Sequence, residues 1–177
     1  MEKKALRKEI REQKRAMTEE MIVSKSEKLA ELFIASEAYQ KATAIYGYLP
    51  YNQEVRTVPM LERAMRDGKR VAVPKCYGDE MRFIWMDDLS KVEKGYAGIP
   101  EPVADEPVAE DETALVLMPG MAFTKEGLRM GYGGGFYDKF LASEPGHPTL
   151  ALCYDFQMVD TIPTEEYDIP VDCVLWA

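Results

Sequence analysis

The segment Ala114–Gly120 reads "ALVLMPG", an apolar run that ends in a proline and a glycine. A strand with one face in water alternates apolar and polar residues, whereas a strand covered on both faces is apolar throughout. This run therefore predicts a strand in the middle of a layered fold. The loop that follows it lies at the carboxyl end of that strand, which is where ligands gather in α/β folds.

Helices and strands alternate on either side of this run. The spacing of apolar residues predicts helices at 2–17, 19–36, 57–68 and 136–142. Thr18 is placed to cap the second helix, and Gly68 lies just past the end of the third. Further apolar runs predict strands at 43–50, 70–76, 81–86, 149–155 and 173–176. The pattern predicts an α/β fold, a three-layer α/β/α sandwich around a mostly parallel, Rossmann-like central sheet.

Residues 94–112, "KGYAGIPEPVADEPVAEDE", are rich in proline, glycine and acidic residues and show no clear periodicity. This composition predicts a long surface connection. It is also found in linkers between domains, but the apolar runs on either side are too few for two cores. We therefore expect a single domain over residues 1–177.

Charge and hydropathy exclude several classes of protein. The net charge of -9 argues against general nucleic-acid binding, which needs a broad basic surface, but it leaves room for a local site for an anion. The sequence contains no run of about 20 apolar residues, so we expect no membrane span. The N-terminal residues do not resemble a secretory signal. We expect a cytoplasmic protein, and a monomer.

Cysteine and histidine give no sign of a metal centre. Cys76, Cys153 and Cys173 are far apart in sequence and lie in apolar runs, so reduced structural thiols are expected. The single histidine, His147, lies in a turn-like segment, which disfavours a metal cluster or a hydrolase built around histidine.

The loop after the central run, Gly127–Phe140, reads "GLRMGYGGGFYDKF". Its glycines suit either a structural turn or an anion site in which backbone N–H groups approach a phosphate at a helix N-terminus. Arg129 favours the anion site, because a guanidinium matches phosphate oxygens. Asp138 falls in the first helical turn, where it suits either the helix dipole or a Mg²⁺ that bridges to phosphate.

Other charged and aromatic residues also allow two interpretations. Lys3, Arg7, Arg11 and Lys14 form a basic stripe, which is either a solvated helix face or a face whose N-terminal part contacts a polyphosphate. Glu54 is either an exposed carboxylate or an acceptor for the N–H groups of a heterocycle. Three aromatic residues serve either in packing or in stacking on an aromatic ligand: Tyr132, Phe136 and Tyr137. Asp168 and Asp172 lie in a loop before the last strand, where solvated acids are expected.

Four segments together resemble the 5-formyltetrahydrofolate cyclo-ligase family, also called methenyltetrahydrofolate synthetases. They are "KKALRKEIREQKRAM", "GYLPYNQEVRT", "VLMPGMAFTKEGLRMGYGGGFYDKFL" and "ALCYDFQMVDTIPTEEYDIPVDCVLW". The likeness spans nearly the whole chain, and the long central segment is the specific one. The resemblance implies an α/β fold and an ATP-dependent, Mg²⁺-requiring cyclisation of 5-formyltetrahydrofolate to 5,10-methenyltetrahydrofolate, with no nucleic-acid or membrane partner.

The resemblance also implies roles for individual residues. Catalytic roles are implied for Lys3 and Arg129. The implied ATP contacts are Lys3, Lys4, Ala5, Leu6, Arg7, Arg129, Met130, Gly131, Tyr132, Gly133, Gly134, Gly135, Phe136 and Tyr137. The implied folate contacts are Leu49, Glu54, Tyr132, Gly133, Gly134, Gly135 and Phe136, and the implied Mg²⁺ ligands are Asp138 and Asp168. Some relatives carry a lysine where this chain has Gly134, so the loop here relies more on its backbone N–H groups.

Two other functions remain open on the sequence. A sugar-phosphate isomerase or an acyl-transfer enzyme would bind phosphate without needing ATP or Mg²⁺. A non-catalytic nucleotide- or folate-binding regulator would keep the binding loop but would lose Lys3, Asp138 or Asp168. All three residues are present, which disfavours the regulator.

Overall fold

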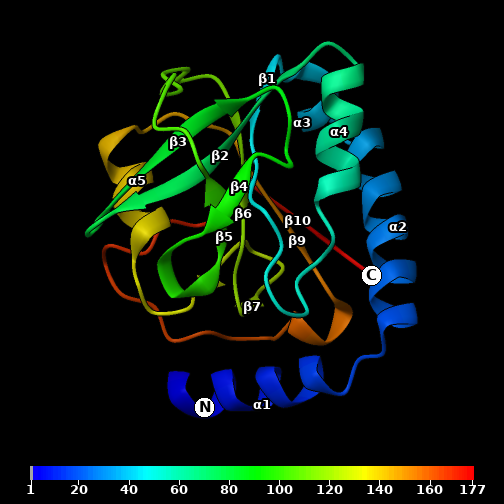
Figure 1. Cartoon of the computed structure of the whole chain (residues 1–177). Helices are drawn as coiled ribbons and strands as arrows, with labels where there is room; N and C mark the ends of the chain where they lie inside the picture. The colour runs from blue at the N-terminus through cyan, green and yellow to red at the C-terminus, as the bar shows by residue number, and fades with distance from the viewer. Residues whose placement is uncertain (1) are drawn as a thin grey trace.

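The computed structural model describes residues 2–177 and contains a six-stranded sheet with helices around it (Figure 1). The strand order is β10-β9-β6-β1-β2-β3, and every neighbouring pair is parallel except the antiparallel pair β2 and β3. The strands are β1 (Ala44–Tyr46), β2 (Arg70–Tyr77), β3 (Glu80–Met86), β6 (Leu115–Met118), β9 (Thr149–Cys153) and β10 (Cys173–Trp176). The predicted mostly parallel α/β fold is confirmed.

The central apolar run forms β6, which pairs with β1 on one side and with β9 on the other. Its side chains alternate between two cores. Leu115 and Leu117 pack into the core on one face of the sheet, and Val116 and Met118 pack into the core on the other face. All four are fully buried, which is why the run contains no polar residue.

Helices cover both faces of the sheet (Figure 1). The helices are α1 (Lys3–Arg15), α2 (Glu19–Ala35), α3 (Glu37–Lys41), α4 (Val58–Arg66) and α5 (Phe136–Ser143). Residues of α2, α3 and α4 pack into one core, and Phe140 and Leu141 of α5 pack into the other. The predicted caps are present: the Thr18 hydroxyl accepts a hydrogen bond from Met21 N, and Gly68 has a φ of 85°.

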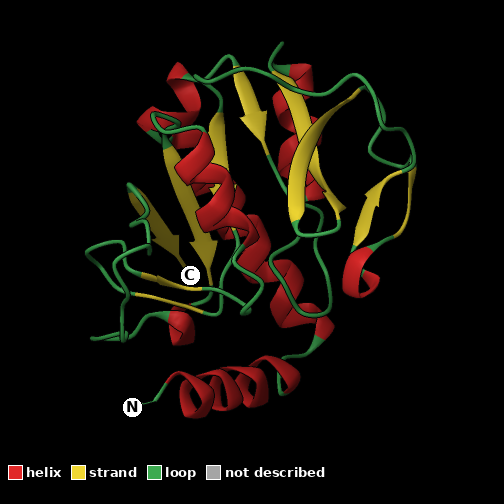
Figure 2. Ribbon diagram, turned by 90° about the vertical axis from the view of Figure 1, so that its left-hand side faces the viewer, coloured by secondary structure: helices red, strands yellow, loops and turns green. Residues whose placement is uncertain are grey.

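The first helix lies apart from these layers, across the carboxyl ends of the parallel strands (Figures 1 and 2). Leu6 and Ile10 of α1 are buried against Met121, Ala122 and Met130 from the loop after β6. The apolar face of α1 therefore attaches this helix to the edge of the sheet where ligands bind in folds of this class.

Three segments differ from the sequence predictions. The predicted helix at 19–36 is followed by the separate α3, because Ser36 breaks the helix and caps the next one through a hydrogen bond from Tyr39 N. The predicted strand at 43–50 is regular only over β1, after which the chain turns toward α1. The loop after β6 contains a small hairpin, β7 (Ala122–Phe123) and β8 (Arg129–Met130).

The segment 94–112 is mostly exposed, as expected for a long surface connection, but it also contains regular pairing that the sequence did not predict. It continues a hairpin of β4 (Val92–Lys94) and β5 (Pro100–Pro102) and then runs along the edge strand β3. Trp85 N donates to Pro107 O at 3.0 Å, and Ala109 N donates to Phe83 O at 2.7 Å. The segment thus covers an edge that would otherwise expose unpaired backbone groups.

The cysteines and the histidine take structural positions. The three cysteines are free, with Cys153 buried and Cys76 and Cys173 half-buried. The buried His147 lies 2.9 Å from Ala114 O and 3.1 Å from Glu144 Oε1, close to the amino end of β6. Among residues 2–177, no helix combines the length and the hydrophobicity needed to cross a bilayer.

Candidate functional site

The candidate site lies at the carboxyl edge of the sheet, where four segments meet. They are α1, the loop after β1, the loop from β6 to α5, and the segment before β10. Each segment contributes at least one charged side chain that the sequence singled out. The contacts between these side chains define the site.

Arg129 is buried under the glycine-rich loop, with its side chain only 6% exposed. Its Nη1 donates to Pro119 O at 3.1 Å, and its Nη2 lies 3.3 Å from Asp138 Oδ2. Its Nε is also buried, and it has no hydrogen-bond partner among the described residues. Since buried N–H groups are nearly always paired, this unused donor suggests that an acceptor outside the protein binds here.

The two predicted metal ligands are brought close together. Asp138 stands in the first turn of α5, and its Oδ1 lies 3.5 Å from the backbone nitrogen of Ile169, the residue next to Asp168. Asp168 Oδ2 lies 3.9 Å from Lys3 Nζ and accepts a hydrogen bond from Glu165 N. Within residues 2–177, no three His, Cys, Asp or Glu side chains form a ready metal cluster.

Three of the four cations of the basic stripe face the site. Arg7 Nε donates to Gly131 O at 3.3 Å, Lys3 approaches Asp168, and Lys14 is buried with 7% exposure. Only Arg11 is exposed to solvent. The interpretation of the stripe as a solvated face is therefore wrong for Lys3, Arg7 and Lys14, because the helix turns this side toward the loop.

Glu54 is linked to Lys14 through a tyrosine hydroxyl. Lys14 Nζ donates to Tyr132 Oη at 3.3 Å, and the Tyr132 hydroxyl donates to Glu54 Oε2 at 2.9 Å. The other carboxylate oxygen accepts from Tyr51 N at 2.8 Å. Partial burial raises the pKa of Glu54, opposed by Lys14 and by these hydrogen bonds, while burial lowers the pKa of Lys14 against the attraction of Glu54. The interpretation of Glu54 as a simple exposed carboxylate is wrong.

Several positions of the loop need glycine, for different structural reasons. Gly133 and Gly135 have φ values of 106° and 71°, a region that other residues rarely adopt. A Cβ on Gly131 would lie 2.8 Å from Arg129 Nη1, so this position needs glycine to let the guanidinium pass. Gly134 does not have a positive φ. A Cβ at this position would lie 3.0 Å from the ring of Phe136. The exposed loop ends at α5, whose first N–H groups have no side-chain cap.

Aromatic side chains border the site near Glu54 and at the start of α5. Tyr132 is 48% exposed beside Glu54, and the ring of Phe136 meets that of Tyr96 edge to face, with 5.1 Å between centroids. Tyr96 comes from the hairpin of β4 and β5 and is 51% exposed. The Tyr51 hydroxyl would lie 3.3 Å from a Cβ on Gly98 of the same hairpin. These contacts bring the hairpin to the site, which the sequence did not predict.

The remaining predicted residues surround this arrangement. Lys4 and Ala5 are exposed on α1, whereas Leu6 and Met130 are buried where α1 meets the loop. Leu49 is buried in the core, and Tyr137 is half-buried, with Arg129 Cζ 6.0 Å from its ring centre.

Sequence reasoning missed Lys14 and Tyr96 as members of the site. The position of Lys14 on the basic stripe was the only signal for it, and Tyr96 was hidden in a segment expected to be an irregular connection.

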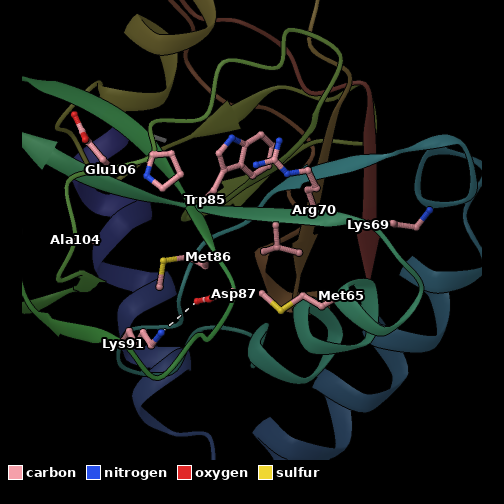
Figure 3. Close-up of a pocket in the computed structure, with 11 residues that line it drawn as sticks. Met65, Lys69, Arg70, Trp85, Met86, Asp87, Lys91, Ala104 and Glu106 are labelled. Carbon is pink, nitrogen blue, oxygen red and sulfur yellow. Dashed lines mark hydrogen bonds and ion pairs between the residues drawn. The ribbon is translucent and has the colours of Figure 1, made fainter.

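A cavity of about 580 Å³ lies elsewhere, near the amino end of β2 (Figure 3). Trp85, Met65 and Met86 line it, and the Arg70 guanidinium stacks 3.8 Å from the centre of the Trp85 ring. None of the predicted site residues lines this cavity.

Comparison with known proteins agrees along the whole chain. The model of the 5-formyltetrahydrofolate cyclo-ligase family matches residues 1–177. The chain is 29% identical to the mouse 5-formyltetrahydrofolate cyclo-ligase over 98% of this chain and 93% of that one, and 29% identical to the Escherichia coli K12 enzyme over 94% and 95%.

Solved structures show the same fold. The NMR structure of the Aquifex aeolicus 5,10-methenyltetrahydrofolate synthetase has a TM-score of 0.85 at 29% identity, covering 99% of this chain and 90% of that one. The structure of the Mycoplasma pneumoniae synthetase, at 23% identity, has a TM-score of 0.76 over 98% of both chains and supports the fold alone. From its sequence, its fold and the motifs that meet at the carboxyl edge, this chain belongs to the 5-formyltetrahydrofolate cyclo-ligase family.

Proposed function

We propose that this protein catalyses the ATP- and Mg²⁺-dependent cyclisation of 5-formyltetrahydrofolate to 5,10-methenyltetrahydrofolate, with release of ADP and phosphate. The observation that supports this most is the buried Arg129, whose Nε lacks a partner among residues 2–177, beneath a glycine-rich loop that Arg7 contacts. Such a site suits a phosphate group, and the family gives the reaction. The proposal describes a single-domain, monomeric, cytoplasmic enzyme.

The chemistry has two steps. The formyl oxygen attacks the γ-phosphorus of ATP, the bond to the ADP oxygen breaks, and an imidate phosphate forms. The N10 amine then attacks the formyl carbon, N10 loses its proton, and the C–O bond breaks to release phosphate. No protein nucleophile is needed, so the protein's task is to align the reactants and to stabilise charge.

The cations at the carboxyl edge suit the phosphates of ATP. Arg129 and Lys3 would act on the transferred phosphate, and Arg7 would hold the polyphosphate beside the loop. The backbone N–H groups of residues 131–135, at the uncapped start of α5, would contribute further donors. The carboxylates that pair with Arg129 and Lys3 show that these cations can hold negatively charged oxygens.

The donor set near these cations fits Mg²⁺, which takes oxygen ligands and commonly uses one or two carboxylates together with phosphates. Asp138 and Asp168 would hold the ion. When bound, Mg²⁺ would neutralise charge on the phosphate oxygens. Arg129 lies 3.3 Å from Asp138 and Lys3 lies 3.9 Å from Asp168, so both carboxylates stand beside cations that would hold the phosphates.

The opposite side of the site suits the folate. Glu54 presents a carboxylate that can accept hydrogen bonds from the amino and ring N–H groups of the pterin. The exposed ring of Tyr132 and the ring of Phe136 offer surfaces for stacking, above the buried Leu49. The glycine loop lies between the two sides, so it would bring the formyl group to the γ-phosphate.

The deciding experiment is to incubate the purified protein with 5-formyltetrahydrofolate and to follow the absorbance of the methenyl product. Product is expected only when both ATP and Mg²⁺ are present, in a one-to-one ratio with the ADP released. Product formation without ATP would reject the mechanism. Tight binding of ATP and folate with no turnover under any condition would support the regulator instead.

A further inference from the structure

Lys14 is a buried lysine that the proposed chemistry leaves without a role. Its side chain comes from the last turn of α1, it is 7% exposed, and an ammonium has three N–H donors. Among the described residues it makes one hydrogen bond, to Tyr132 Oη. Burying a charge costs free energy unless the charge is paired, so the position of Lys14 needs an explanation.

The charged partner of Lys14 is Glu54, which it reaches through the Tyr132 hydroxyl. Tyr132 accepts from Lys14 and donates to Glu54, so a cation and a carboxylate are joined through one phenol. This chain connects three segments that are distant in sequence: α1, the glycine-rich loop and the loop after β1. It fixes both the direction of the Glu54 carboxylate and the tilt of the Tyr132 ring.

The surroundings of Glu54 contain no other cation that acts on it. Of the charged side chains in residues 2–177, Lys14 is the one that lowers the pKa of Glu54. The remaining titratable groups that face Glu54, from the loop after β1, the glycine loop, α5 and the residue after β9, are tyrosines: Tyr48, Tyr132, Tyr137 and Tyr154. Lys14 itself faces only Glu54 and the thiol of Cys153 besides Tyr132.

We propose that Lys14 is a positioning residue that acts through the Tyr132 hydroxyl to keep the Glu54 carboxylate ionised and oriented toward the bound folate. This inference rests on the proposed function, in which Glu54 accepts hydrogen bonds from the pterin. A protonated Glu54 would lose acceptor capacity, so loss of Lys14 weakens folate binding and leaves the ATP side unchanged.

The first test uses the ligand-free protein and does not depend on turnover. The ¹³C shift of the Glu54 carboxyl group, assigned with Glu54→Gln, is followed against pH in the wild type and in Lys14→Met, Lys14→Arg and Lys8→Met. Lys8 is exposed on the same helix, so its variant is the matched control. The Glu54 titration is expected to move up by about one pH unit in Lys14→Met only. Identical titrations in wild type and Lys14→Met overturn the proposal.

The second test measures kinetics as a function of pH. In Lys14→Met the KM for 5-formyltetrahydrofolate should rise about tenfold while the KM for ATP stays the same, and the acid limb of kcat/KM should move to higher pH. Lys14→Arg should restore both. Equal changes in both KM values, or an unmoved acid limb, would show a merely structural lysine.

Two controls keep the tests separate. If Lys14→Met does not fold, Lys14→Gln removes the charge while keeping a donor for Tyr132, and the same titration decides. If the wild type shows no turnover, the proposed function is rejected. The pH titration of the Glu54 carboxyl group in the ligand-free protein still shows whether Lys14 affects its ionisation.

Discussion

Arg129 and Asp138 form an ion pair across the two ends of the glycine-rich loop, with 3.3 Å between Nη2 and Oδ2. Arg129 belongs to β8, before the loop, and Asp138 belongs to the first turn of α5, after it. The pair therefore holds the loop closed at its base. It also keeps a guanidinium buried with one N–H group that no described residue uses.

Replacing Arg129 by lysine tests whether catalysis needs only a positive charge at this position or also the N–H groups of the guanidinium. A lysine keeps the positive charge, but it cannot bond Pro119 O and Asp138 together and still present a further N–H group. We expect kcat/KM to fall by about 100-fold, as for loss of a preorganised donor to a developing negative charge. Steady-state kinetics and a thermal melt measure this, with the exposed Arg11→Lys as control. Near-normal turnover in a folded Arg129→Lys would remove Arg129 from the mechanism.

Asp138→Asn tests the proposed metal site. The amide has nearly the same shape but lacks the charge that a Mg²⁺ ion needs. We expect the Mg²⁺ concentration for half-maximal activity to rise about tenfold, with a smaller effect on the KM for folate. Asp160→Asn, in an exposed loop, is the control. An unchanged Mg²⁺ dependence in Asp138→Asn would mean that the ion is held elsewhere.

Tyr96 should matter for folate, although it lies in a hairpin that the sequence did not connect with the site. Its ring meets Phe136 edge to face and half of its surface is exposed. Tyr96→Ala should raise the KM for 5-formyltetrahydrofolate several-fold, consistent with about 0.5–1.5 kcal/mol for an aromatic contact. Tyr96→Phe keeps the ring and should behave as wild type. Equal KM values for the alanine variant and wild type would place the hairpin outside the site.

The raised pKa of Glu54 should also contribute to the pH dependence of the free energy of unfolding. Partial burial raises its pKa above the ordinary 4.5, so the folded protein binds more protons than the unfolded chain just above pH 4.5. In that window this group makes stability fall as the pH rises. Urea unfolding at several pH values should show that Glu54→Gln lacks this contribution relative to wild type. A difference between the two proteins that does not vary with pH would contradict the shift.

The fold was predictable because its strands contain apolar runs and its helices are periodic. β6 could be recognised from Leu115–Met118 alone, since a strand inside two cores has no polar face. The hairpin of β4 and β5 could not be recognised, because its pairing joins prolines and acidic residues that have no strand pattern. There the tertiary contact with β2, through Lys75 and Glu101, holds what local preference does not.

The site was predictable where a single segment contains several of its residues, as in the glycine loop with Arg129 and Asp138. The site was harder to predict where the role of a residue depends on which side of its helix faces the loop. Periodicity places Lys14 on the same stripe as Lys3 and Arg7, but only the packing of Leu6 and Ile10 shows that this stripe faces the loop. The pairing of Lys14 with Glu54 through Tyr132 needs three segments in place at once.

The proximity of Lys3 to Asp168 has a consequence for how the protein becomes active during synthesis. The helix that contains Lys3 leaves the ribosome before the sheet, yet the carboxylate it meets belongs to a segment that emerges after almost every strand of the sheet. The apolar face of α1 can pack on Met121, Ala122 and Met130 before then, but Lys3 has to wait for Asp168. A nascent chain stalled before residue 160 would contain most of the sheet but no complete site, so activity would appear only after Asp168 has left the ribosome.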